Sequence, residues 1–541
     1  MIKSPRLKRV REVLCFFILF LFLNLLTIQA TENFLNTLDS YIEKVRKEWE
    51  VPGLAVALVK NGKMIFAKGY GVRKLGEPAP VTPGTLFGIA SNTKAFTTTA
   101  LAILVDEGKI KWDDPVIKYL PDFCMFDPYV TREITIRDLV THRSGLGLGA
   151  GDLLYWPQST YSRKEIIYRV RFIKPYFSFR SKFAYCNILY IVAGEIIPAV
   201  TGKTWSEFIK ERIFKPLGMT FSTTSIKEFR PGGNIASPHT RFNGQIKPVD
   251  YENLDNVGPA GAINSNVIDM SKWIIVHLNS GLIRNSPKGE IRLFSVNASK
   301  EMWSPQTIIP IRDYPPELAK IKPNFFAYGL GWMLRDYYGH KIVYHTGSIK
   351  GMVSRVTLVP DLKLGIVVLT NQESRQAYEA ITYYILDHYL DIPPTDWITA
   401  FKKAEQRTKK RVAKIMKNLA LKRVKNTKPS LDISKYAGRY IDQWYGEMVI
   451  EKVNNKLVMR FLHTPALIGD LEHWHYDTFI VRWRDRSLNA DAFVTFMLNY
   501  KGEIEQVKMV PVSPLTDFSF DFQDLLFKPV KLKNKFKEVK K

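Results

Sequence analysis

A serine and a lysine one helical turn apart, Ser91 and Lys94, are the residues of this chain best placed to do chemistry. They flank Asn92-Thr93 and precede the apolar run AFTTTALAILVDEGKI. Serine becomes a nucleophile when a neighbouring group takes its proton, and a lysine three residues later on a helix lies on the same face. At a helix start the serine N–H is a free donor, and the helix dipole favours negative charge. The segment can therefore supply a nucleophile, a general base and half of an oxyanion hole.

The residues after Lys94 predict the helix that this chemistry needs. Leu101, Leu104 and Val105 recur with helical spacing, and Gly108 is a natural stop. This is the only S-x-x-K tetrapeptide in the chain. Taken alone, it is also compatible with an ordinary N-capping serine and a solvated lysine.

A second candidate group, Tyr185-Cys186-Asn187, precedes an apolar helical stretch over 188–200. A nearby lysine cation lowers the pKa of a tyrosine, so Tyr185 beside Lys94 is expected to exchange a proton with Ser91 and with the leaving group. Asn187 can hydrogen-bond to Lys94 or to a substrate carbonyl. The alternative is a core tyrosine and a capping asparagine.

A third group, His345-Thr346-Gly347-Ser348, lies on a strand-like stretch before Gly351. Glycine lets a substrate backbone approach a strand edge closely, and the Ser348 N–H is a candidate second oxyanion donor. His345 is a candidate proton-exchanging or orienting group, although an isolated histidine is also often structural.

The sequence predicts neither a metal site nor a cofactor. His473 and His475 share one strand face and His463 lies nearby in the sequence, but aromatic residues interleave and no carboxylate cluster accompanies them. The G-x-S-x-G elbow, the Walker loop, the dinucleotide fingerprint and H-E-x-x-H are all absent. Their absence argues against an α/β-hydrolase, a nucleotide enzyme and a zincin.

The N-terminal residues 1–30 read as a secretory signal peptide, with five basic residues, an apolar run and Ile28-Gln29-Ala30 as a cleavage site. We therefore expect an exported protein, periplasmic or extracellular, with an uncleaved anchor as the alternative. Cys15 lies in this segment. Cys124 and Cys186 remain, and these two are not a disulfide framework, although a single bridge between them stays open.

The net charge of +26 is concentrated in three segments. Residues 1–30 carry +4, residues 401–428 carry +11 and residues 528–541 carry +6, which leaves +5 for everything else. The domains are thus nearly balanced. For an exported protein we expect no nucleic-acid partner, and an anionic membrane surface or cell-wall polymer is the better match to the basic segments.

Patterning along the 541 residues predicts two folded domains. Residues 31–398 read as an α/β domain whose sheet combines a hairpin near residues 51–67 with strands near residues 351–370, with helices between them. Residues 431–527 read as a small β domain, followed by the basic tail 528–541. Between the domains, residues 399–430 form a basic amphipathic linker that either lies on a membrane or packs on the catalytic domain.

Taken together, these features resemble the serine hydrolases related to class C β-lactamases and penicillin-binding proteins. That group includes D-aminopeptidases, family VIII carboxylesterases and LACTB-like proteins. The motifs SNTK at 91, YCN at 185 and HTG at 345 occur in the group's order. Connecting phrases also resemble it, including ITIRDLVTHRSGL, FKPLGM, PAGAINSNVIDMSKW, YGLGW and GIVVLTN, and the similarity covers about residues 33–392.

The resemblance implies a fold and a set of roles. The fold is an α/β (α+β) β-lactamase/transpeptidase-like antiparallel sheet flanked by helices, with an all-helical subdomain and an appended C-terminal all-β domain. Ser91 would be the acylated nucleophile, and Lys94 and Tyr185 would share the general-base work. Asn187 would position Lys94 and substrate, and the N–H groups of Ser91 and Ser348 would form the oxyanion hole.

Two departures from the group's pattern bear on the substrate. His345 stands where β-lactamases and penicillin-binding proteins usually carry lysine, whose permanent cation helps to bind a substrate carboxylate. Cys186 stands where a serine or alanine is usual, and the similar size is expected to preserve the geometry. We therefore expect an acyl-enzyme hydrolase of carboxylic esters or of D-amino-acid-containing amides and peptides.

Three alternatives remain open from the sequence. The first is β-lactamase activity, or DD-carboxypeptidase activity on a peptidoglycan-like peptide. The second is a catalytically silent envelope-binding protein. The third is an electrostatic membrane tether that carries an incidental hydrolase.

Overall fold

The computed structural model describes residues 32–283 and 291–530. The segment predicted to be a signal peptide and most of the basic tail lie outside the described residues. Within the described ranges, no helix is both long and apolar enough to cross a membrane. Cys124 and Cys186 are both free thiols.

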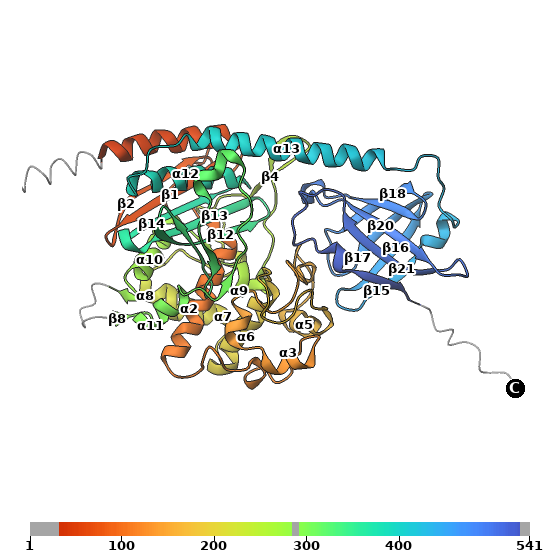
Figure 1. Ribbon diagram of the computed structural model, residues 1–541, viewed down its shortest axis with the longest axis horizontal. Helices are drawn as coiled ribbons and strands as arrows, with labels where there is room; N and C mark the ends of the chain where they lie inside the picture. Colours follow the sequence, from red (N-terminus) through yellow and green to blue (C-terminus); the bar gives the residue numbers. More distant parts are fainter. Residues whose placement is uncertain (1–31, 284–290, 531–541) are drawn as a thin grey trace, which may run out of the picture.

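An eight-stranded antiparallel sheet forms the centre of the first domain (Figure 1). The sheet combines strands from both ends of the domain, as the sequence predicts, and its long central strands are almost fully buried. In spatial order the strands are β2 (Lys63–Gly71), β1 (Gly53–Lys60), β14 (Leu364–Thr370), β13 (Met352–Val359), β12 (His340–Ile349), β11 (Met333–Tyr337), β10 (Phe326–Tyr328) and β9 (Thr307–Ile308).

One face of this sheet is covered by a helix over residues 32–48 together with α12 (Arg375–Tyr389) and α13 (Trp397–Leu421). Buried side chains of these helices, such as Leu38, Ile42 and Ile381, share one apolar cluster with strand residues. The buried positions along these helices recur with the spacing expected of amphipathic helices that pack on a sheet.

The opposite face is covered by α10 (Val267–Leu278) and by a group of helices that lies below the sheet in Figure 1. This group is the predicted all-helical part of the domain. It contains α2 (Thr93–Asp106), α3 (Pro128–Glu133), α4 (Ile136–Leu139), α5 (Arg163–Arg169), α6 (Ile188–Thr201), α7 (Trp205–Ile209), α8 (Lys215–Leu217), α9 (Gly258–Gly261) and α11 (Val296–Met302). Short two-stranded pairs connect them: β3 (Phe87–Gly88) with β6 (Asn264–Ser265), β4 (His239–Phe242) with β5 (Gln245–Pro248), and β7 (Leu282–Ile283) with β8 (Ile291–Arg292).

The C-terminal domain is a closed barrel of eight antiparallel strands. The sequence predicts its β character and the hairpin turn at Asn454-Asn455, where both residues have positive φ, but not the closure. Closure leaves no free sheet edge. The strands are β15 (Gly438–Asp442), β16 (Gly446–Val453), β17 (Lys456–Phe461), β18 (Ile468–His475), β19 (Thr478–Trp483), β20 (Ala492–Leu498), β21 (Ile504–Pro511) and β22 (Leu526–Pro529).

The helix α13 connects the two domains, and its first turns pack on the hydrolase-like domain. Trp397, Ile398 and Phe401 are buried there, and Trp397 Nε1 donates to Asp387 Oδ2 at 2.8 Å. The domain boundary predicted at residue 398 therefore falls inside a continuous helix. Farther along, Ile415 and Leu419 of the predicted apolar stripe line a cavity toward the barrel.

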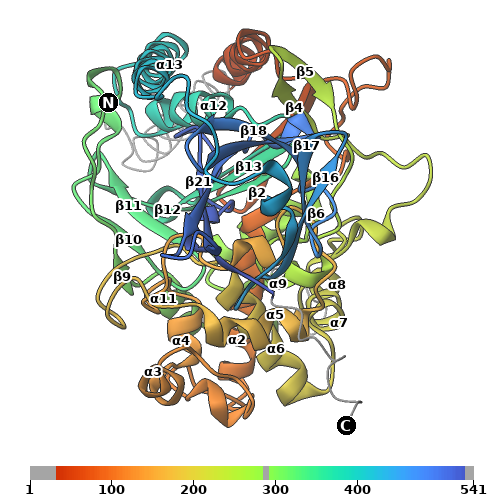
Figure 2. The ribbon, with the colours of Figure 1, turned by 90° about the vertical axis from the view of Figure 1, so that its right-hand side faces the viewer.

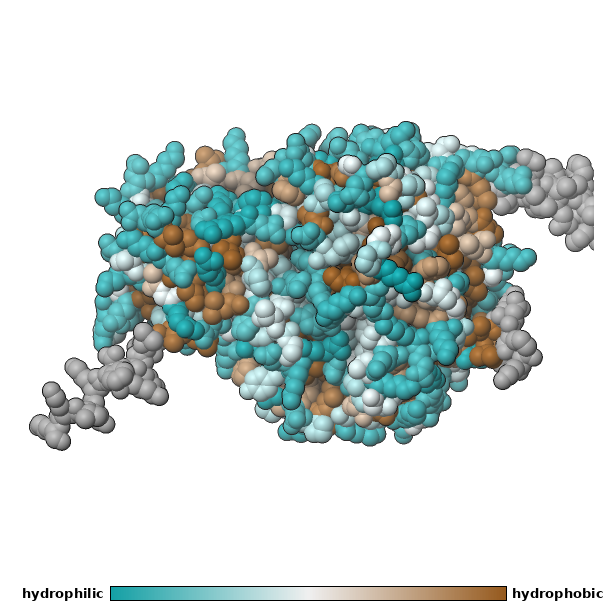
Figure 3. Space-filling model, turned by 180° about the vertical axis from the view of Figure 1, so that it is seen from behind, coloured by the Kyte–Doolittle hydropathy of each residue, from teal (hydrophilic) through white to brown (hydrophobic). Residues whose placement is uncertain are grey.

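The barrel also contacts the helical part of the first domain directly, and it lies in front of β12 and β13 in Figure 2. Arg169 donates to Trp444 O at 2.9 Å, and the rings of Tyr161 and His463 stack with centroids 4.0 Å apart. Seen from behind, the surface is mostly hydrophilic, with hydrophobic side chains in separate patches (Figure 3).

Candidate active site

Ser91 lies in a 3-10 turn, η1 (Ala90–Asn92), that leads directly into α2. This is the predicted position at a helix start. The preceding residue, Ala90, has a φ of 49°, a left-handed conformation that is costly for a residue with a side chain. Ser354 fixes the turn, because its Oγ donates to Ile89 O at 2.8 Å and accepts from Asn92 Nδ2 at 2.8 Å. The backbone around Ser91 is therefore held by the sheet.

Lys94 is fully buried, and its amine is aimed at the serine. Its Nζ lies 2.9 Å from Ser91 Oγ, 2.7 Å from Asn187 Oδ1 and 3.0 Å from Ala260 O. Burial disfavours the charged form and lowers the pKa of Lys94 to about 7. A neutral amine donates two hydrogens, which suit Asn187 and Ala260, and its lone pair then faces the Ser91 hydroxyl. This arrangement is that of a general base for the serine.

The structure brings Tyr185 to the same serine, but it contradicts the expected direction of its pKa. Tyr185 lines the same cavity as Ser91 and interacts with it, and Lys94 Nζ lies 4.9 Å from the centre of the Tyr185 ring. Burial nevertheless raises the pKa of Tyr185 well above its usual value. The prediction that the lysine would lower this pKa was wrong, because desolvation outweighs the nearby amine. Tyr185 is a protonated phenol that can pass a proton to or from Ser91.

Asn187 links Lys94 to an acidic residue that sequence reasoning missed. Asn187 Nδ2 donates to Asp152 Oδ2 at 2.8 Å, and Asp152 is fully buried. Burial raises the pKa of Asp152 to about 7. Asp152 begins the turn η3 (Asp152–Leu154), just after Gly149 and Gly151, which have φ of 71° and 84°. These glycines within the run GLGLGAGD were the available signal for this position.

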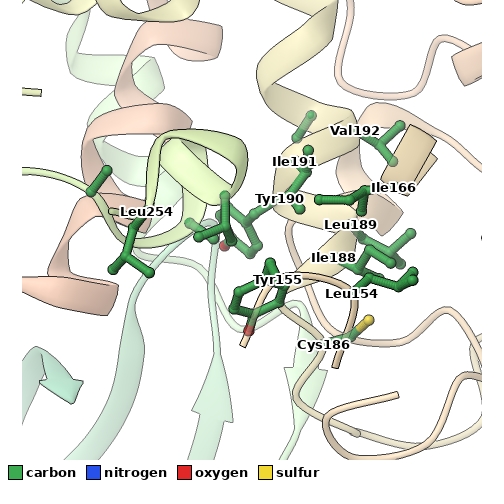
Figure 4. Packing of buried hydrophobic residues seen from close by; sticks show 14 of the residues in the cluster. Leu154, Tyr155, Ile166, Cys186, Ile188, Leu189, Tyr190, Ile191, Val192 and Leu254 are labelled. Carbon is green, nitrogen blue, oxygen red and sulfur yellow. The ribbon is translucent and has the colours of Figure 1, made fainter. Parts of the chain in front are cut away.

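Buried apolar side chains pack around the start of α6 (Figure 4). Leu154, Cys186, Ile188 and Leu189 are buried together there. Cys186 N donates to His142 Nδ1 at 3.0 Å, and the ring of His142 lies 4.2 Å from that of Tyr185. His142, in the phrase THRSGL, is therefore a further residue that positions Tyr185 and that sequence reasoning missed.

His345 is buried on β12 and is neutral. Its Nδ1 lies 2.7 Å from Thr346 O, which can only accept, and its Nε2 lies 3.0 Å from the Tyr328 hydroxyl. One donating and one accepting nitrogen describe a neutral imidazole. Burial lowers the pKa of His345 to about 3. At neutral pH this position therefore offers no cation to a substrate carboxylate.

Thr346, Gly347 and Ser348 line the same cavity as Ser91. The pairing of β12 with β11 stops at Tyr344, so this part of β12 has a free edge on that side. A Cβ on Gly347 would lie 2.1 Å from Ile89 O, so only glycine lets η1 approach β12 this closely. Glycine is thus needed at position 347 because the backbone that carries Ser91 packs directly against it. The oxyanion role of the Ser348 N–H stays a prediction.

The cavity in front of Ser91 has a volume of about 370 Å³, which suits a small ligand. Its wall carries both charges, with Glu373 and Asp517 beside Lys350 and Arg375. Lys350 is paired with Asp485 of the barrel at 3.0 Å. Sequence reasoning missed the barrel's share of the wall, which consists of Ser487, Leu488, Asp517, Phe518, Ser519 and Phe520.

In the part of the chain that the structure describes, no group of three or more His, Cys, Asp or Glu side chains is arranged to hold a metal ion. The barrel histidines have other contacts. His463 Nδ1 lies 2.9 Å from Thr160 Oγ1, and His473 Nε2 lies 2.8 Å from Tyr476 O.

Comparison with known protein families places this site in context. The family described as Beta-lactamase matches residues 38–390, which include every candidate residue of the three motifs. The chain belongs to the Beta-lactamase family. A domain of unknown function, DUF3471, matches residues 422–529, which contain the barrel.

Two curated members of this family illustrate the range of relatives. An unguisins hydrolase from Aspergillus campestris is 31% identical over 454 residues, which cover 78% of this chain and 79% of the relative. The protein flp of Staphylococcus aureus is 27% identical, over 65% of this chain and 66% of its own length.

Solved structures confirm the β-lactamase-like fold. An octameric penicillin-binding protein homologue from Pyrococcus abyssi superposes with a TM-score of 0.58 at 22% identity, covering 91% of this chain and 99% of that one. A D-amino acid amidase from Ochrobactrum anthropi superposes with a TM-score of 0.52 at 23% identity, covering 68% of this chain and 99% of that one. At these identities the likeness concerns the fold.

Proposed function

We propose that this member of the Beta-lactamase family is a serine hydrolase that forms an acyl-enzyme at Ser91, with a carboxylic ester or a D-amino-acid-containing amide as its substrate. One observation carries the proposal. A buried lysine amine with a pKa of about 7 lies 2.9 Å from the hydroxyl of Ser91. Near neutral pH that amine has a free lone pair for the serine proton.

The proposed reaction has two halves. In the first, Lys94 takes the Ser91 proton, Oγ attacks the carbonyl carbon, and the N–H groups of Ser91 and Ser348 stabilise the oxyanion. Tyr185, which is protonated, gives its proton to the leaving alcohol or amine, and Lys94 passes the proton taken from Ser91 back to Tyr185. In the second half, water replaces the leaving group and the same residues return the acid product and the free serine.

The charges around the cavity support substrates without a carboxylate. His345 is neutral, and the carboxyl groups of Glu373 and Asp517 lie on the cavity wall. Burial, and to a lesser degree the negative charge of Asp517, raise the pKa of Glu373, while Lys350 on the same wall is already paired with Asp485. The name of one relative, an unguisins hydrolase, agrees with hydrolysis, and that of a D-amino acid amidase with a similar fold agrees with an amide substrate.

A matched pair of substrates tests this proposal. We expect kcat/KM for a C-terminally amidated D-alanyl dipeptide to exceed that for the same dipeptide with a free carboxylate by about tenfold or more, because one unpaired charge in such a site costs at least about 1.4 kcal/mol. An activated short-chain ester and a penicillin are measured alongside. Faster turnover of the penicillin or of the free carboxylate would establish the β-lactamase or DD-carboxypeptidase alternative instead. Turnover of none of these compounds would contradict the proposal and favour the silent binding protein.

The basic residues of 401–428 support a second, independent proposal, that α13 contacts an anionic membrane surface once the protein is exported. Their outer face is exposed, and no helix within the described residues spans a membrane. We expect binding to anionic vesicles, at least tenfold weaker at 0.5 M salt, that is lost when Lys410, Arg411, Lys414 and Lys417 are changed to glutamine. The matched control neutralises exposed lysines on the first domain: Lys63, Lys111, Lys164 and Lys300. Equal loss in both variants, or no binding by the wild type, would refute a specific role for α13.

A further inference from the structure

One segment of the barrel, residues 512–521 between β21 and η12 (Phe522–Asp524), reaches into the first domain next to Ser91. Ser519 Oγ donates to Asp152 Oδ2 at 2.9 Å. Asp521 accepts from Gly151 N at 2.7 Å and from Leu153 N at 3.2 Å. The barrel therefore holds both the side chain of Asp152 and the backbone on either side of it.

These contacts continue without a gap to the catalytic lysine. Asp152 Oδ2 accepts from Asn187 Nδ2 at 2.8 Å, and Asn187 Oδ1 lies 2.7 Å from Lys94 Nζ. Asp152 and Lys94 are fully buried, and Asn187 and Ser519 are 7% and 9% exposed. In such surroundings the contacts are little screened, so each residue fixes the orientation of the next.

We propose that the C-terminal barrel is part of the catalytic machinery, with Ser519 as a positioning residue that holds Asp152 and, through Asn187, aims the Lys94 amine at Ser91. This inference rests on the proposed function and gives the barrel a task within it. The barrel matches a domain of unknown function, and the proposal gives that domain a role in positioning catalytic residues.

The hydrogen bond from Ser519 acts on charge as well as on orientation. It stabilises the ionised form of Asp152, and the negative charge of Asp152 in turn favours the protonated form of Lys94. Removal of the Ser519 hydroxyl therefore favours neutral Asp152 and, through it, neutral Lys94. The acid limb of the pH–rate profile should then move to lower pH.

Other titratable groups also face Asp152 and Lys94, and none of them reverses the expected shift of the acid limb to lower pH. His142 and His345 are neutral, since burial lowers the pKa of both. The phenols and the thiol nearby are protonated, since burial raises the pKa of Tyr155, Tyr185, Tyr190 and Cys186. The second buried acid, Asp521, has its pKa raised by burial and by Asp152. Loss of the hydrogen bond from Ser519 to Asp152 removes none of these groups.

The test compares variants of the full-length protein in hydrolysis of an activated ester. We expect Ser519→Ala to lower kcat by about tenfold with little change in KM, because a hydrogen bond to a charged group is lost. We also expect its acid limb to shift to lower pH by about half a unit. Ser519→Thr, which keeps the hydroxyl, should restore both values, and Ser513→Ala on the same segment is the control. The Ser513 hydroxyl accepts from Leu515 N at 3.1 Å within the same segment, and Ser513 does not line the Ser91 cavity.

Thermal unfolding of each variant separates positioning from stability. If Ser519→Ala unfolds, the near-isosteric pair Ser519→Thr and Ser519→Val isolates the hydroxyl, and only the valine variant should show the shifted profile. A wild-type kcat and pH profile in Ser519→Ala, or equal profiles for threonine and valine, would overturn the role of Ser519 and leave the proposed function standing. Failure of the wild-type protein to acylate at Ser91 would instead remove the proposed function and this inference together.

Discussion

Ser91→Ala is expected to lower kcat/KM for an activated ester by about 10⁴-fold or more, because no acyl-enzyme can form without the nucleophile. The change should leave the fold intact. The Ser91 side chain is partly exposed, and the turn around it is held by Ser354. The measurement is steady-state hydrolysis together with thermal unfolding of both proteins.

The control for that experiment is Ser304→Ala, a serine whose hydroxyl donates to Lys300 O and which does not line the Ser91 cavity. It should retain wild-type kinetics. Residual activity of Ser91→Ala above one tenth of wild type would show that another group is the nucleophile, and the acyl-enzyme proposal would fail.

The second large effect concerns Lys94 and pH. Wild-type kcat/KM is expected to rise with pH through a midpoint near 7, because Lys94 can take the serine proton only when neutral and its pKa is about 7. Below that midpoint the rate should fall about tenfold per pH unit, as the neutral fraction does. The measurement is kcat/KM between pH 5 and pH 9 with a neutral ester substrate.

Two replacements of Lys94 separate charge from basicity. Lys94→Met keeps the length without an amine, and Lys94→Arg keeps a cation that cannot give up its proton at these pH values. Both should lower kcat/KM by about 10² to 10⁴-fold, the usual contribution of a general base. An unchanged pH profile in Lys94→Arg, or a flat wild-type profile between pH 5 and pH 8, would exclude Lys94 as the base.

Much of the fold follows from local patterns in the sequence. Helical spacing after Lys94 and a stop at Gly108 predict α2, which ends at Asp106, and the apolar run after Asn187 predicts α6. The order of the three motifs, together with strands at both ends of the domain, predicts the sheet and its β-lactamase-like fold. The two helix signals are local, since each lies within or beside the helix that it predicts, where backbone geometry dominates.

What the sequence did not predict depends on burial and on distant contacts. The raised pKa of Tyr185 comes from desolvation by residues that only the folded chain brings together. Asp152 meets Ser519 across 367 residues, so no local pattern connects them. The barrel residues that line the Ser91 cavity could not be predicted for the same reason. Their position depends on how α13 and the closed barrel are placed against the first domain.

The most direct test of the account is the mass of the intact protein after brief mixing with an activated short-chain ester and acid quenching, followed by mapping of the modified peptide. The account predicts one added acyl group on the wild-type protein, located on the peptide that contains Ser91, and none on Ser91→Ala. An acyl group on any other residue, an adduct that persists in Ser91→Ala, or turnover of the ester without an adduct at Ser91 on any timescale of quenching would contradict it.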